Sequence, residues 1–154
     1  MITIRHSIFE TNSSSVHVLV IPKDAKIIIP NVVYLNRNEY GWSDDNEFDT
    51  LSYFYQACVD RGTDEVLKLV EYLKRKGVEE IHCREIGSTV PNFSGFIDHS
   101  EEIPLDYLFS NENLLDRFIF GSESFVEIGN DNDEYCPRTS NYDANKYDTI
   151  KKGN

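Results

Sequence analysis

The residue types best suited to chemistry gather near the start of the chain, in a loop of six consecutive polar residues between two apolar runs. A hairpin can be closed with about two residues, so this loop is longer than a connection requires. Short hydroxyl and amide side chains bond to nearby backbone groups and leave N–H groups free to hold an anion. An arginine before the loop could reach a phosphate or carboxylate. The sequence therefore predicts a ligand site formed by Arg5, Glu10, Thr11, Asn12, Ser13, Ser14, Ser15 and His17.

Two interpretations of this loop are left open. In the first, the serines only complete a turn and satisfy backbone groups at the ends of two strands. In the second, loop amides and Arg5 hold a small anionic ligand, such as a phosphate-containing nucleotide, which the protein sequesters or uses in a transfer reaction. His17 opens a strand directly after the serines, so we expect its ring at the rim of the loop, where it could touch such a ligand.

Whether the protein is an enzyme is also left open, although the sequence favours a non-enzymatic role. The loop holds the residue types of a nucleophile, a base and an acid, but neighbours along one strand rarely adopt the geometry that nucleophilic catalysis needs. Walker A, G-x-G-x-x-G, H-E-x-x-H and G-x-S-x-G motifs are absent from the sequence. An ADP-ribosyltransferase-like site would combine the serines with Arg5 or His6 and with Glu123 or Glu127, at a spacing that matches such enzymes poorly.

The negative charge of the chain is unevenly distributed. The formal net charge is −12, and residues 85–150 hold fourteen acidic against three basic residues. Residues 41–60 hold five acidic residues and no lysine or arginine. Such a field repels nucleic acids and anionic membrane surfaces and attracts basic proteins, including those that normally bind nucleic acid. We predict a partner-binding surface that includes Asp44, Asp45, Glu47 and Asp49, and the sequence leaves a homo-oligomer open.

Cysteine usage and hydropathy indicate a cytoplasmic protein without a cofactor. Three scattered cysteines form no disulfide framework and no zinc-binding spacing. No apolar run reaches the length of a membrane span, and the first residues lack the pattern of a signal peptide. The Asn/Asp run at 129–134 lacks the glycine and closing glutamate of a calcium loop, so no metal is expected.

Apolar periodicity predicts a single α+β domain over residues 1–136, followed by a polar surface tail over 137–154. Residues 2–9 and 16–21 are predicted to form a hairpin at or near the centre of a mixed or antiparallel sheet, and the second run is apolar on both faces. Helices are predicted over 47–61, over 63–76 with Thr63 as N-cap, and over 111–119, all packed on one face of the sheet. Val66, Leu67, Val70 and Leu73 are expected to form the apolar stripe of the second helix.

The stretch from Arg5 to His17, with Phe9-Glu10-Thr11-Asn12-Ser13-Ser14-Ser15 at its centre, resembles the start of a group of small proteins from bacteria and their phages. Residues 120–132 are similar to members of the same group. The resemblance implies a setting, a phage or another mobile element, rather than a particular chemistry. In that setting, we expect a compact acidic protein to interfere with host defence, as an anti-CRISPR-like inhibitor of a nucleic-acid-binding effector does.

Overall fold

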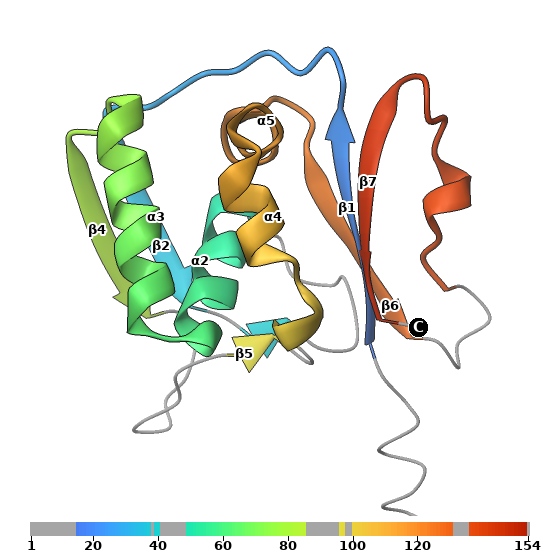
Figure 1. The fold of residues 1–154 in the computed structure, drawn as a ribbon, viewed down its shortest axis with the longest axis horizontal. Coiled ribbons are helices and arrows are strands. Elements are labelled where there is room, and N and C mark those ends of the chain that lie inside the picture. Colours follow the sequence, from blue (N-terminus) through green and yellow to red (C-terminus); the bar gives the residue numbers. More distant parts are fainter. Residues whose placement is uncertain are drawn as a thin grey trace, which may run out of the picture.

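Strand β1 (Ser15–Pro22) is the middle strand of the central sheet, between β6 (Phe125–Asn130) and β7 (Tyr147–Lys152). Both neighbours run antiparallel to β1, at the right of Figure 1. The structure is a computed structural model that describes residues 15–37, 39–40, 49–85, 96–97, 100–130 and 136–153. The strand predicted over residues 2–9 lies outside these ranges.

Burial explains why β1 occupies the centre. All eight of its residues are buried, which suits a strand that is apolar on both faces. Leu19 and Ile21 face the helices and belong to the main hydrophobic core. The prediction of a central strand in this part of the sequence is confirmed.

The polar tail predicted over residues 137–154 is wrong for its last part. Tyr147–Lys152 form β7, which pairs with β1 over the register from His17↔Lys152 to Pro22↔Tyr147. Because β7 is an edge strand and mostly half-buried, its sequence carries few apolar residues, and its strand character was not visible in the hydropathy pattern.

A second, parallel sheet joins β2 (Val32–Arg37) to β4 (Glu80–Glu85). Parallel strands need a long crossover, and α2 (Thr50–Arg61) and α3 (Thr63–Lys76) lie between these two strands in the sequence. A short parallel pair joins β3 (Glu39–Tyr40) to β5 (Phe96–Ile97), and α2 and α3 again lie between the two strands in the sequence. In Figure 1 the helices lie between the β2–β4 sheet and the central sheet.

Glycines set the ends of α2 and α3. The N–H of Gly62 bonds to the Cys58 carbonyl, which closes α2 at the predicted place. A single residue separates the two helices, so Gly62 also occupies the N-cap position of α3 and Thr63 is already helical. The prediction of Thr63 as the N-cap is therefore wrong. Gly77, with φ 105°, ends α3 as predicted.

The apolar stripe of α3 follows the prediction at Val66, which packs against the core, and at Leu73, which is buried, but not at Leu67. Leu69, Tyr72 and Leu73 are buried, whereas Leu67 is 56% exposed. Residues at positions i, i+3, i+4 and i+7 share one helix face, and Leu67 stands about 100° away from that face.

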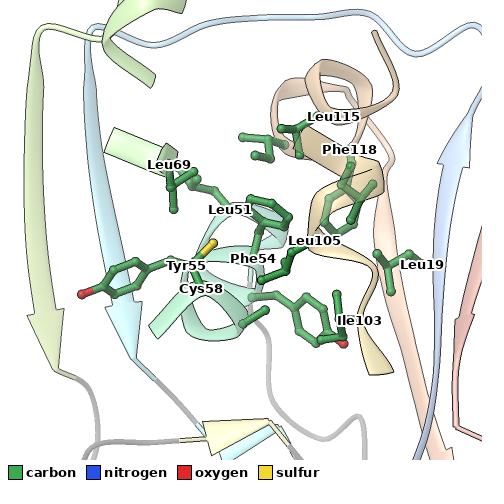
Figure 2. Close-up of a cluster of buried hydrophobic side chains, with 14 of the residues drawn as sticks. Leu19, Leu51, Phe54, Tyr55, Cys58, Leu69, Ile103, Leu105, Leu115 and Phe118 are labelled. Carbon is green, nitrogen blue, oxygen red and sulfur yellow. The ribbon is translucent and has the colours of Figure 1, made fainter. Parts of the chain in front are cut away.

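The C-terminal helices complete the core. After the 3-10 turn η1 (Ser100–Glu102) come α4 (Leu105–Ser110) and α5 (Glu112–Phe120). Asn111 caps α5 by accepting a bond from the Leu114 N–H at 3.4 Å. In Figure 2, Phe54 of α2 lies among side chains of α4 and α5, and its ring meets those of Phe109 and Phe118 at centroid distances of 5.3 and 6.5 Å. The 3-10 turn η2 (Thr139–Asn141) precedes β7. Helices packed on sheets in one domain confirm the α+β class.

An ionic cluster joins α3 to α5. Lys76 donates to the Asp116 carboxylate at 2.8 Å and lies 3.1 Å from Glu112, which also pairs with Arg75. The hydrogen bond from Lys76 is the main reason why the pKa of Glu112 lies below its ordinary value. The cluster holds the two helices together across the surface of the core.

Candidate functional site

The structure describes three of the residues predicted to bind a ligand or a partner: Ser15, His17 and Asp49. The others lie outside the described residues, namely Arg5, Glu10, Thr11, Asn12, Ser13, Ser14, Asp44, Asp45 and Glu47. Their roles stay predictions.

Ser15 is held by a lysine that the sequence analysis did not single out. The Lys152 ammonium donates to the Ser15 carbonyl oxygen and to Ser15 Oγ, both at 2.9 Å. Both side chains are buried, with exposures of 0% and 1%. Since 137 positions separate the two residues, no local pattern could have paired them. The only hint of a buried lysine in the sequence is its place at the end of the partly apolar run Tyr147–Lys152.

The residue after Lys152 tightens this contact. Gly153 has φ 93°, and a Cβ at this position would stand 2.6 Å from the Ser15 carbonyl oxygen. Only glycine combines this backbone conformation with so close an approach. The end of β7 is thereby pressed against the start of β1.

His17 lies on the same face of the sheet as Ser15 and Lys152. It is two residues from Ser15 on β1 and is the register partner of Lys152 on β7. Its Nδ1 shares a hydrogen bond of 2.6 Å with the Tyr53 hydroxyl of α2. We expected the ring at the exposed rim of the loop; it is fully buried instead, and the Tyr53 ring of α2 packs against it at a centroid distance of 5.7 Å.

Ser15, His17, Tyr53 and Lys152 therefore form a buried polar cluster at the start of β1. Each of these side chains is at most 1% exposed, so none can touch a ligand in solution in this arrangement. The cluster fixes the backbone at the start of β1, directly after the stretch predicted to form the loop. Any direct ligand contact by the predicted site falls to Arg5 and the residues from Glu10 to Ser14.

The structure does not bring the transferase candidates to this cluster. Glu123 stands just before β6, at the Pro22 end of β1, whereas Ser15 is at the other end. Seven residue steps of a strand separate these ends by roughly 23 Å. Glu127 accepts a hydrogen bond from the Tyr142 hydroxyl at 2.6 Å.

Asp49 has a structural task. It is the N-cap of α2, and its carboxylate accepts bonds from Ser52 N–H at 2.6 Å and from Ser52 Oγ at 2.9 Å. The same Ser52 Oγ accepts a bond from the Asn36 N–H of β2 at 3.2 Å. Asp49 thus ties the start of α2 to the end of β2, in addition to any contact with a partner.

A surface that the sequence analysis did not identify lies on β2 and the residues before it. Among the described residues, eight large hydrophobic side chains are exposed, and five of them fall within residues 27–34: Ile27, Ile28, Ile29, Val32 and Tyr34. On the β2–β4 sheet the Tyr34 ring stacks on His82 at 5.2 Å, and His82 Nε2 lies 3.1 Å from a Glu80 carboxylate oxygen. The clustering of apolar residues around Pro30 was visible in the sequence, but their exposure was not.

Searches of protein-family models, curated proteins and solved structures found no significant match to the chain. Among the described residues, no helix is long and apolar enough to cross a membrane. In the same part of the chain, no three His, Cys, Asp or Glu side chains gather as metal ligands would.

Proposed function

We propose that the protein is a non-enzymatic binding protein, encoded by a phage or mobile element, that counters host defence by holding a protein with a basic surface. The observation that supports this function best is the exposed apolar segment 27–34. The setting rests on the resemblance of the loop sequence, and the choice of partner rests on charge.

The 27–34 segment has the composition of an interface centre. Ile28 is 61% exposed and Tyr34 is 44% exposed, and the same segment holds three further exposed apolar side chains. Soluble proteins seldom leave such residues together on the surface unless a partner covers them. Tyrosine and isoleucine at the centre with charges at the border is the usual anatomy of an interface.

Carboxylates border this segment. The N–H groups of Glu79 and Glu80 donate to the Asn31 carbonyl oxygen at 2.8 and 3.0 Å, which fixes two acidic residues beside Pro30. In the sequence, β2 leads into the acidic stretch that contains Asp44, Asp45 and Glu47. An apolar centre with an acidic border suits an apolar segment flanked by lysine or arginine.

Net charge favours a basic partner over a second copy of the chain. Two copies would each carry a formal charge of −12, and like net charges oppose association. A nucleic-acid-binding protein presents the opposite charge, so the same field accelerates its approach. We therefore assign the 27–34 segment to a basic protein, such as the effector of a defence system.

The test is quantitative capture of a partner from host lysate, followed by affinity measurement with the purified partner over a salt series. Two variants are compared with the unchanged chain: Tyr34→Ala, and a triple reversal of Asp44→Lys, Asp45→Lys and Glu47→Lys. Asp49 is left in place because it caps α2. We expect Tyr34→Ala to lose at least about 1 kcal/mol of binding free energy, and the triple reversal to remove the salt dependence.

The matched control variants carry substitutions on α3 and η1, away from the 27–34 segment. Leu67→Ala removes an exposed apolar side chain of α3, and Glu101→Lys with Glu102→Lys reverses two exposed charges of η1. Both should bind as the unchanged chain does. A partner that is basic and captured, yet binds the triple reversal equally well at every salt concentration, would refute the electrostatic part of the proposal.

A second candidate function is the binding of a phosphate-containing nucleotide at the Glu10–Ser15 loop. One observation favours it: the Lys152 ammonium donates to Ser15 Oγ at 2.9 Å, which places a cation beside the last residue of this stretch. A thermal-shift screen of nucleotides tests this function. A ligand at about 100 times its dissociation constant should add about 2.7 kcal/mol of stability, and Arg5→Met should abolish the shift. A panel without any shift would leave the loop as a structural turn.

A further inference from the structure

Three turns meet at the Pro22 end of the central sheet, because β1 runs antiparallel to both of its neighbours. They line an open surface pocket of about 370 Å³, a volume within the range of small-molecule sites. Its walls are formed by Pro22, Lys23, Asp24, Glu123, Asn145, Lys146 and Tyr147. This pocket lies at the opposite end of β1 from the buried polar cluster.

The charged groups of the pocket balance in number but do not neutralise one another. Two lysines and two carboxylates line it. Lys23 Nζ lies 4.0 Å from Asp148, which Arg117 already holds at 2.9 Å. For the Asp24, Glu123 and Lys146 side chains, the described part of the chain shows no ion pair and no hydrogen bond. Charges of both signs are therefore available to a ligand.

Glu123 is the unusual member of this set. With φ 67°, it is the one described residue other than glycine that has a positive φ. Glycine or asparagine would adopt this conformation more readily. The turn does not depend on the carboxylate, because its side-chain bonds come from the neighbours: the Lys26 N–H donates to Ser122 Oγ and Ser124 Oγ donates to the Arg117 carbonyl. A residue with a strained backbone whose side chain has no structural role is a sign of function.

We propose that this pocket binds a small zwitterion of the amino-acid class. Lys23 and Lys146 would hold its carboxylate, Glu123 and Asp24 its ammonium group, and the Tyr147 ring and Pro22 its apolar part. A simple anion would meet two carboxylates here, and a simple cation would meet two lysines, so a ligand with both charges fits best. This site goes beyond the proposed partner binding and does not depend on it.

The experiment is calorimetric titration of the purified chain with each of the twenty common amino acids. The tightest binder is then compared with its two single-charge analogues, one without the amino group and one without the carboxylate. We expect saturable binding of at least one amino acid, and analogues that bind about tenfold more weakly or worse, because a hydrogen bond to a charged group is worth roughly that factor. Failure of the whole panel would overturn the proposal, as would analogues that bind as well as the zwitterion.

Variants assign the binding to the pocket. Glu123→Asn and Lys146→Met should each weaken binding about tenfold, whereas Lys151→Met, an exposed lysine on β7, should leave it unchanged. The melting temperature separates a binding role from a structural one: Glu123→Asn should leave it equal or higher, because asparagine tolerates the left-handed conformation. A fall in melting temperature, or unchanged binding by both pocket variants, would show that the carboxylate serves the fold or that the ligand binds elsewhere.

Discussion

The residues at the start of β1 show how burial decides what a polar side chain can do. Ser15, His17 and Lys152 lie on the face of the central sheet that the helices cover, and each is at most 1% exposed. A buried polar group costs free energy unless it is hydrogen-bonded. The bonds from Lys152 to Ser15 and between His17 and Tyr53 offset this cost. These residues therefore fix the start of β1, and any ligand contact by the predicted site depends on the residues before them.

Removal of one hydroxyl tests this view of the cluster. Tyr53→Phe keeps the buried ring but leaves His17 Nδ1 without the 2.6 Å bond. We expect a loss of about 1–3 kcal/mol in the free energy of unfolding, the cost of a buried polar group that loses its partner. Urea denaturation measures this loss. Tyr107→Phe removes an exposed hydroxyl as a control and should change stability by less than about 0.5 kcal/mol; equal effects of the two variants would contradict the argument.

The sequence singled out Ser15 and His17 as candidate site residues, but it could not show that both are buried. His17 meets Tyr53 over 36 positions, and Ser15 meets Lys152 over 137. Such contacts depend on how strands and helices pack, which local periodicity does not report. Asp49 is different: an aspartate just before an apolar helical pattern is a recognisable N-cap, yet we considered only its charge.

Among the elements, the helices followed the sequence pattern well because their apolar spacing is a local property. α2, α3 and α5 occupy the predicted regions, with glycine and asparagine at their ends. β7 was missed because an edge strand of a small sheet needs few apolar residues. The α3–α5 contact could not be foreseen either, since it joins charges of two helices that are far apart in the sequence.

That contact makes stability depend on pH. The pKa of Glu112 is lowered from its ordinary 4.5, first by the hydrogen bond from Lys76 and also by the charges of Lys76 and Arg75. A carboxylate with a lowered folded-state pKa stabilises the fold above its unfolded pKa, and this contribution disappears as the pH falls through the folded value. The stability advantage of the unchanged chain over Glu112→Gln should therefore be complete at about pH 6 and shrink below about pH 4.5.

Urea denaturation at a series of pH values measures this advantage. In a Lys76→Met background, the same Glu112→Gln change should show a smaller dependence on pH, because the main cause of the pKa shift is gone. An advantage that is the same at every pH would show that ionisation of Glu112 contributes nothing to the stability of the fold.

At the scale of the whole molecule, the α+β class and the central place of β1 were predictable, whereas the partners of β1 were not. The two-sided apolar pattern of β1 requires cover on both faces, but nothing in the sequence chooses β6 and β7 as its neighbours. Strand pairing over such separations is decided by the global fold. The same holds for the exposure of the 27–34 segment and for the pocket at the Pro22 end, because both depend on how distant parts of the chain pack.

The position of β1 between β6 and β7 has a consequence during synthesis on the ribosome. β1 is the first strand of the described chain to be made, yet β6 begins at residue 125 and β7 at residue 147. Until then both of its edges are open, and an open apolar edge is a template for aggregation. The helical pair α2–α3 depends on contacts close in sequence and can form in the meantime. In a growing chain, β1 is therefore made before the other described strands and is among the last of them to be fully paired.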